Sequence, residues 1–274
     1  SDIQNGSFRH FERLNRSGPG IAGIDRGRQL IWNGNWSAQL ADEDRWKLSA
    51  VEQGIHLSLE LRSLKRPVLH GKDGVHQKST EHGSASHYVS LTRLESTGNL
   101  VLDGRESALS GLSWMDHEFF SNLLAEGQVG WDWFSMQFEN GTELMLFRLR
   151  HREEQKSSSG GSFVQKDGTV VEIAAGEMQL QTTEHFRSRK TNATYPIGWR
   201  IAIPRLNVEL RTTTHLRDQE LVSKLGISPK YWEGAIECEG TMQGVAMRGK
   251  GYLELTGYAD TVQIERDGPQ VRGR

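Results

Sequence analysis

Short runs of alternating hydrophobic and polar residues recur along the chain and are separated by turn residues. Alternation with a period of two is typical of antiparallel strands that bury one face. Three pairs, Asp103-Gly104, Asn140-Gly141 and Asp167-Gly168, lie between such runs and predict two-residue hairpin turns. The main further strands are predicted in RQLIWNGNWSAQL, GIHLSLELRSL, SHYVSLTRL, GWRIAIPRLNVEL, YWEGAIECEG and GKGYLELTGY. Helical patterns are limited to DHEFFSNLL and RDQELVSKLG, so the sequence predicts an all-β protein.

The Asn140-Gly141 hairpin is predictable in more detail, because a two-residue turn fixes the strand register. This register places Trp133 opposite Arg148 and Trp131 opposite Arg150, where each guanidinium would stack on an indole ring. Asp132 then falls on the apolar face, where a carboxylate requires a partner or a strand-end backbone amide. That apolar face would carry Phe134, Met136, Met145 and Phe147.

The polar segment HREEQKSSSGGS lies near the middle of the chain and predicts a loop. A chain of 274 residues is long enough for two β-domains of moderate size. We therefore place a domain boundary near residues 151–162, with one domain over residues 1–155 and a second over residues 156–274.

Composition excludes several classes of protein. The chain has 33 basic and 35 acidic residues, so it offers no net positive field for nucleic acid or an anionic membrane. A single cysteine excludes an internal disulfide, and no apolar run is long enough to span a bilayer. The chain begins with neither Met nor an apolar signal segment, which indicates a processed or partial sequence.

An uninterrupted acid–base–acid run stands in GLSWMDHEFF. On a strand, Trp114, Asp116 and Glu118 would share one face, with His117 on the other. Two neighbouring carboxyl groups repel each other, so one of them would retain a proton and serve as a general acid. The alternative is structural, with Asp116 as the N-cap of a short helix.

Histidines offer weaker signals. Four occur in HGKDGVHQKSTEHGSASHYVS, but their spacing fits neither a helical nor a strand ligand pair, so we expect no metal site. His87 begins a strand, where a hydrogen-bonded core histidine is more common than a catalytic base. Tyr231 and Glu233 lie on a late strand, where alternation favours cross-strand pairs over catalytic groups. The chain contains no G-x-S-x-G, H-E-x-x-H, P-loop or G-x-G-x-x-G motif, which weakens hydrolase and nucleotide-binding interpretations.

Several motifs, taken together and in order, resemble the AttH-like or hydroxyneurosporene-synthase (carotenoid 1,2-hydratase-like) lipocalin family. They are HYVSLTRL, GLSWMDHEF, GWDWFSMQFENGTELMLFRLR, YPIGWRIAIP, YWEGAIECEG and GYLELTGY. The resemblance implies two consecutive antiparallel lipocalin-like (calycin) β-barrels. Family members carry an early Glu-Trp-Trp-Tyr segment that is absent here, so the first barrel is expected to lack its N-terminal strands. Phe186 stands where the family often has a tryptophan.

The resemblance also implies a role in lipid metabolism and a hydrophobic lipid or isoprenoid ligand. In the hydratase hypothesis, Asp116 protonates a C=C bond, Trp114, Trp131 and Trp133 stabilise the cation, and His87 or His117 orients water. Glu118, Asp132, Tyr231 and Glu233 complete the expected ligand site. This chemistry requires no cofactor. The alternative is a non-catalytic periplasmic or secreted carrier that serves a membrane transporter of the ABC type, and hydrolase activity is the weakest candidate.

Overall fold

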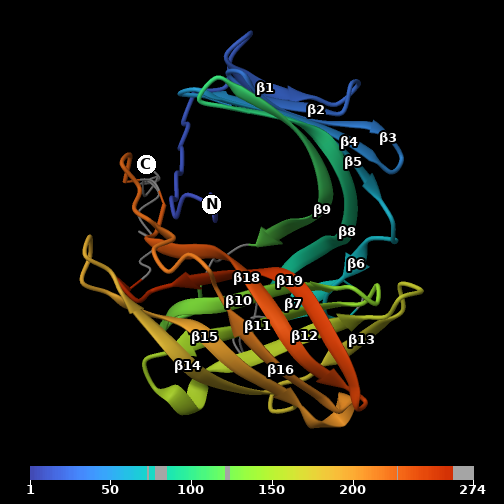
Figure 1. Ribbon diagram of the computed structural model, residues 1–274, viewed down its shortest axis with the longest axis vertical. Coiled ribbons are helices and arrows are strands. Elements are labelled where there is room, and N and C mark those ends of the chain that lie inside the picture. The colour runs from blue at the N-terminus through green and yellow to red at the C-terminus, as the bar shows by residue number, and fades with distance from the viewer. Residues whose placement is uncertain (73, 78–84, 121–123, 227, 262–274) are drawn as a thin grey trace, which may run out of the picture. The chain divides into compact units, whose positions relative to one another are not determined.

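The computed structural model describes residues 1–72, 74–77, 85–120, 124–226 and 228–261. Within these residues the chain is all-β, contains two short 3₁₀ helices and no α-helix, and builds two large antiparallel sheets (Figure 1). The all-β prediction is confirmed. No helix among the described residues is long and apolar enough to cross a membrane.

The first sheet has nine strands in the described part of the chain, ordered β1-β2-β3-β4-β5-β8-β6, with β7 and β9 also paired to β8. The sheet curves as a half-barrel (Figure 1). Its strands are β1 (Ala22–Asp25), β2 (Leu30–Asn33), β3 (Trp36–Asp42), β4 (Arg45–Glu52), β5 (Ile55–Ser63), β6 (Val68–Leu69), β7 (Val75–Gln77), β8 (Ala85–Leu102) and β9 (Arg105–Phe120).

The second sheet has ten strands in the described part, ordered β13-β12-β11-β10-β19-β18-β16-β15-β14, with β17 paired to β18. Its strands are β10 (Gln128–Phe138), β11 (Glu143–His151), β12 (Ser158–Val164), β13 (Val170–Ile173), β14 (Gln179–Arg187), β15 (Thr194–Ile203), β16 (Val208–Thr213), β17 (Glu220–Leu221), β18 (Tyr231–Met242) and β19 (Val245–Thr256). The 3₁₀ helices are η1 (Glu154–Lys156) and η2 (Pro204–Leu206).

The chain divides into two compact units. The smaller unit comprises Arg9–Val68 and Val89–His117, and the larger unit comprises Ser1–Phe8, Leu69–Tyr88 and the described residues from Glu118 onward. The expected boundary near residue 155 falls between β11 and β12, which pair with each other in one sheet. The two compact units are discontinuous in sequence, and the division into domains over residues 1–155 and 156–274 stays a prediction.

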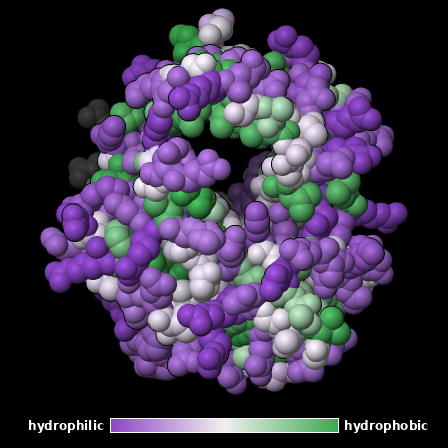
Figure 2. Space-filling model, viewed as in Figure 1, coloured by the Kyte–Doolittle hydropathy of each residue, from purple (hydrophilic) through white to green (hydrophobic). Residues whose placement is uncertain are grey.

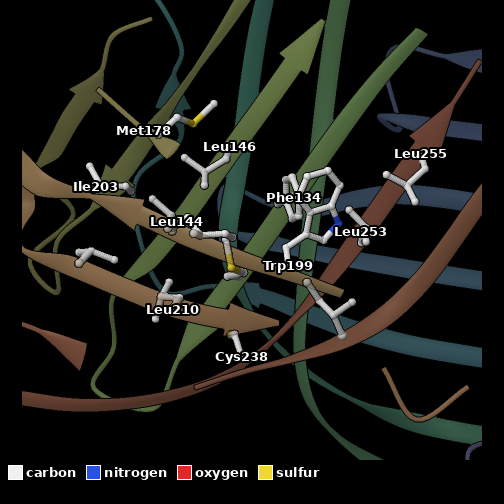
Figure 3. Packing of buried hydrophobic residues seen from close by; sticks show 14 of the residues in the cluster. Phe134, Leu144, Leu146, Met178, Trp199, Ile203, Leu210, Cys238, Leu253 and Leu255 are labelled. Carbon is white, nitrogen blue, oxygen red and sulfur yellow. The ribbon is translucent and has the colours of Figure 1, made fainter. Parts of the chain in front are cut away.

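Hydrophobic side chains from the second sheet fill the core of the larger unit (Figure 3). The rings of Phe134 and Trp199 meet edge to face, with centroids 5.5 Å apart, and Leu253 and Leu255 of β19 pack beside them (Figure 3). Cys238 also lies in this core, and burial raises the pKa of its thiol to about 12. The visible surface is mostly hydrophilic, with hydrophobic residues in small groups (Figure 2).

The three predicted hairpin turns all occur, but only one has the predicted length. Asp103 and Gly104 both have positive φ angles, 50° and 81°, as a two-residue turn requires. In the hairpin of β10 and β11, the amide of Phe138 donates to Thr142 O at 2.9 Å, so three residues form the turn. The turn at Asp167-Gly168 likewise closes with the amide of Gln165 donating to Thr169 O.

The longer turn shifts the register of β10 against β11 by one residue, so the predicted register is wrong. Trp133 pairs with Phe147, and Asp132 pairs with Arg148. The side chain of Asn140 stabilises this turn because its Oδ1 accepts from the amide of Thr142 at 3.0 Å. The predicted stacking of Arg148 and Arg150 on the two indoles is therefore not formed. The apolar face of the hairpin instead combines Phe134 and Met136 with Leu144 and Leu146.

The correct register provides the partner that Asp132 requires. Its buried carboxylate lies 2.7 Å from Nη2 of Arg148 and 3.3 Å from Nε of Arg150. The hydroxyl of Tyr258 donates to the same carboxylate at 2.7 Å, and Arg150 lies 3.9 Å from the centre of the Tyr258 ring. A buried carboxylate with two guanidinium partners is a stabilising element of the sheet and not an isolated charge.

Two other sequence interpretations are corrected. Ser158–Ser162, predicted as part of a loop, lie in β12, where a Cβ on Gly161 would approach Met145 O to 2.2 Å. Glycine is therefore required by close strand packing and does not mark a flexible loop here.

The segments predicted as helices also differ: Asp116 to Phe120 continue β9, and Glu220–Leu221 form β17. Residues 121–123 of the first segment lie outside the described residues.

We expect Asp132→Asn to lower the free energy of unfolding by about 3–5 kcal/mol, because it leaves two guanidinium groups with a neutral partner. Chemical denaturation of the full chain measures this loss. Asp260→Asn is the matched control, since Asp260 forms an exposed ion pair with Lys230 and its loss should cost less than about 1 kcal/mol. Equal losses in both variants would contradict a stabilising role for the Asp132 cluster.

Candidate functional site

A row of register partners crosses the outer face of the second sheet, opposite the hydrophobic core. It consists of Gly160, Phe147, Trp133, Glu254 and Glu233, on β12, β11, β10, β19 and β18 respectively. We call these five residues the cross-strand row. Side chains at paired positions on neighbouring strands lie on the same face, so the row brings an aromatic pair next to a carboxylate pair.

The two carboxyl groups occupy directly opposed positions on β18 and β19. Gln243 and Gly244 form the two-residue turn between these strands, with φ angles of 51° and 77°, and this turn fixes the opposition of Glu233 and Glu254. Both side chains are half-buried. Like charges at such positions repel, so one proton is retained by the pair over a wider pH range than by an isolated glutamate.

Burial raises the pKa of Glu233 above the usual value for glutamate, while hydrogen bonds with Tyr252 and Glu254 act in the opposite direction. The hydroxyl of Tyr252 lies 3.2 Å from Oε2 of Glu233 and donates to it. Burial, reinforced by Glu233, also raises the pKa of Tyr252, so this phenol keeps its proton. The raised pKa extends the pH range over which Glu233 keeps its proton, so Glu233 is a candidate proton donor.

Aromatic rings surround the carboxylate pair. The indole Nε1 of Trp131 donates to Glu254, and the Trp131 ring meets that of Tyr231 at a centroid distance of 6.2 Å. The indole Nε1 of Trp133 donates to the hydroxyl of Tyr88 at 2.9 Å. Electron-rich ring faces beside an acid stabilise positive charge that develops on a bound molecule.

The structure therefore brings together four of the predicted ligand residues, Trp131, Trp133, Tyr231 and Glu233. Asp132 lies on the opposite, core-facing side of β10 in its ion cluster. Sequence reasoning did not include Glu254 in the site. The Gln-Gly turn is the signal that identifies it, because a two-residue turn there pairs Glu254 with Glu233.

The Asp-His-Glu run lies within β9 and not at a helix start, so the N-cap alternative is wrong. In the smaller unit, Asp116 is exposed, and its Oδ1 accepts from Ser90 Oγ and from Nε1 of Trp114, the latter at 2.6 Å. This bond agrees with the predicted common face of Trp114 and Asp116. Met115 points to the other face and packs against the small hydrophobic cluster of Leu61, Leu91 and Leu94.

The other predicted residues have separate environments. His117 is exposed on β9 in the smaller unit. In the larger unit, Glu118 accepts from Ser86 Oγ at 2.6 Å, and His87 lies with Nδ1 3.2 Å from Gly74 O. The predicted gathering of Trp114, Asp116 and His117 with Trp131 stays a prediction, as does proton sharing between Asp116 and Glu118.

Metal binding finds no support in the described ranges. Across them, no group of three or more His, Cys, Asp or Glu side chains is arranged to hold a metal ion. His82, one of the four clustered histidines, lies outside these ranges.

Comparison with known proteins agrees with the all-β, lipocalin-like class defined by the fold. The model of the AttH-like family matches residues 1–258, so the chain belongs to the AttH-like family. An AttH crystal structure from Nitrosomonas europaea is 26% identical and superposes with a TM-score of 0.84, covering 94% of this chain and 79% of that one. The resemblance inferred from the sequence motifs is confirmed.

Two more distant relatives have names that refer to hydration or dehydration. Kievitone hydratase from Nectria haematococca superposes with a TM-score of 0.69 at 15% identity, covering 84% of this chain and 70% of that one, and this similarity shows the fold alone. Dehydratase asqC of Emericella nidulans is 18% identical over 246 residues, or 85% of this chain. The chain spans 66% of the length of that dehydratase, just under two thirds.

The raised pKa of Glu233 predicts a pH-dependent effect on stability. An acid whose pKa is higher in the folded state stabilises the fold below its unfolded pKa, and this contribution is lost as pH rises through the folded pKa. The Glu233→Gln side chain stays neutral at every pH, so the variant does not lose the stability that the wild type loses when Glu233 ionises. We therefore expect the variant to melt at a higher temperature than the wild type near pH 8. The difference should disappear at about pH 4, where the wild-type carboxyl is also neutral.

Glu237→Gln is the control, because Glu237 lies four residues further along β18, is exposed, and contacts His215 at 3.1 Å. Its melting temperature should show no such gain at high pH. A Glu233→Gln protein that melts below the wild type near pH 8 would be incompatible with a destabilising charge at this position.

Proposed function

We propose that the chain binds a hydrophobic molecule of the lipid or isoprenoid class and catalyses hydration or dehydration at a carbon–carbon double bond. The proposal rests on one observation: a carboxyl group with a raised pKa belongs to a carboxylate pair walled by three aromatic residues. Membership of a family with hydratase and dehydratase relatives supports the same chemistry. No cofactor is required by the proposed steps.

In the hydration direction, Glu233 donates its proton to one carbon of the double bond, and the adjacent carbon becomes cationic. The faces of Trp131, Trp133 and Tyr231 stabilise that charge. A water oxygen then forms a bond to the cation, and the carboxylate pair accepts the proton that this water loses. The pair ends with the proton it began with, so the cycle is balanced, and dehydration is the same sequence reversed.

Each carboxyl group of the pair accepts a hydrogen bond from an aromatic residue. Trp131 donates to Glu254 and positions that carboxyl group. Tyr252 donates to Glu233 and holds its carboxyl group in place on the sheet. Because burial raises the pKa of Glu233, we assign Glu233 as the acid and Glu254 as the group that accepts the proton from water. Transfer of that proton from Glu254 back to Glu233 completes the cycle.

The test of this assignment is isotope exchange with a panel of short terpenoid alcohols and alkenes in water labelled with heavy oxygen. Reversible dehydration incorporates the label into the alcohol, and mass spectrometry detects it. We expect Glu233→Gln to lower the exchange rate by about a hundredfold or more, while ligand binding is retained. Glu237→Gln should exchange at the wild-type rate.

Exchange that survives unchanged in Glu233→Gln would overturn the assignment of the acid. A wild-type protein that binds these molecules but never incorporates the label would instead favour the carrier function over the catalytic one.

Asp116 is tested in the same assay as a second candidate acid. If Asp116 is the proton donor, Asp116→Asn should abolish exchange while ligand affinity is retained. If its role is to hold Ser90 of β8 and Trp114 of β9 in place, the variant should lose roughly 1–3 kcal/mol of stability and keep its exchange activity. Melting temperature and exchange measured on the same sample separate the two outcomes.

A further inference from the structure

A cavity of about 360 Å³ lies in the larger unit, against the same outer face of the sheet that carries the carboxylate pair. One wall is the segment that contains His70, Val75 and His76, and the other is formed by β11, β12 and the end of β13. Apolar groups on the second wall are contributed by Met145, Phe147, Ile173, Ala174 and Ala175. None of the residues predicted from the sequence as site residues lines this cavity.

The cross-strand row connects the cavity to the carboxylate pair. Phe147 lines the cavity, Trp133 is its partner on β10, and Glu254 is the partner of Trp133 on β19. Neighbouring strands lie about 4.8 Å apart, so two strand spacings, roughly 10 Å, separate Phe147 from Glu254 along the row. A single extended molecule is able to reach from one to the other.

Side-chain contacts make the same connection. His70 lines the cavity, and its ring lies 4.4 Å from that of Tyr88, centroid to centroid. The Tyr88 hydroxyl accepts from Trp133 at 2.9 Å. The cavity wall and the aromatic wall of the carboxylate pair are therefore parts of one packed structure.

One polar group of the cavity lining, His70, is hydrogen-bonded and buried. His70 Nδ1 lies 2.9 Å from Ser162 Oγ, and both residues are buried. Burial lowers the pKa of His70 to about 3, so the imidazole carries no charge at neutral pH. Lys72 and Glu172 also line the cavity, but its apolar groups outnumber these two charged ones and favour a hydrocarbon occupant.

Gly160 of β12 is closely packed against the cavity wall. A Cβ on Gly160 would lie 3.1 Å from ring atoms of Phe147 and from Ile173 O, so even one added methyl group would crowd the wall. Gly160 is also the terminal member of the cross-strand row. The row therefore ends at the cavity wall on β12 and in a carboxyl group on β18.

We propose that this cavity binds the hydrocarbon chain of the substrate and so selects substrates by chain length. The inference rests on the proposed function, because it places the reacting double bond at the carboxylate pair and the remote chain in the cavity. A methylene group takes about the space of a water molecule, roughly 30 Å³ in the liquid, so 360 Å³ accommodates about twelve carbons. The substrate class is an amphipathic molecule with an unbranched or isoprenoid chain of about that length.

The experiment measures binding of linear alkanols of increasing length, by displacement of the fluorescent probe N-phenyl-1-naphthylamine from the full chain. Affinity should rise about fourfold for each added methylene group until the cavity is full, and then level off near twelve carbons. Binding is measured without turnover, so this result does not depend on the identity of the catalytic acid.

Two cavity variants change the available length in opposite directions. Val75→Phe narrows the cavity, so the affinity should level off at an alkanol shorter by about two carbons. Phe147→Ala widens the cavity, so the affinity should level off at an alkanol longer by several carbons. Val170→Phe is the control for the first, since Val170 has 40% exposure against 41% for Val75 and lies outside the cavity. Phe186→Ala is the control for the second, because Phe186 is also half-buried but packs against the core.

Opposite shifts in the two cavity variants, with wild-type plateaus in both controls, support the inference. A plateau that neither cavity variant moves, or that the controls move equally, overturns it. If the affinity levels off with chain length but the protein never incorporates heavy oxygen, the cavity is supported as a binding site and the proposed catalysis is overturned.

Discussion

The pairing of β10 with β11 on one side and β19 on the other determines which side chains meet on each face of the second sheet. A shift of one residue exchanges the two faces of a strand. In the observed register, Phe134 and Met136 enter the core, Asp132 meets Arg148, and Trp133 is left on the outer face beside Glu254. Packing, charge compensation and the candidate site are therefore all consequences of the same register.

This dependence also explains why the core and the site have such different compositions. The inner face is filled by large apolar side chains (Figure 3). The outer face is free of that packing requirement and accommodates carboxyl groups, phenols and indoles close together. A lipocalin-like sheet is usually considered for what its interior binds, but here the chemistry-bearing residues lie on the opposite surface.

The sequence predicted the features that depend on local pattern. Strand positions followed from alternation, and Asp103-Gly104 followed from the φ preferences of its residues. The register at Asn140-Gly141 was missed because the same residue pair occurs in two-residue and three-residue turns, and the additional hydrogen bonds of Asn140 decide between them. The pairing of Glu233 with Glu254 was within reach of the sequence, through the Gln-Gly turn, but the cavity was not. Its first wall comes from a segment more than eighty residues away from β12, and no local pattern reports such a contact.

Cys238 has a practical consequence for experiments on this protein. It is the single cysteine of the chain, it is buried, and its thiol is held in the unreactive protonated form far above neutral pH. A cysteine introduced at an exposed position, such as Val245 in the hairpin between β18 and β19, would therefore be the one thiol that alkylating dyes modify. The natural sequence can thus serve directly as the background for site-specific labelling, with no prior removal of its own cysteine.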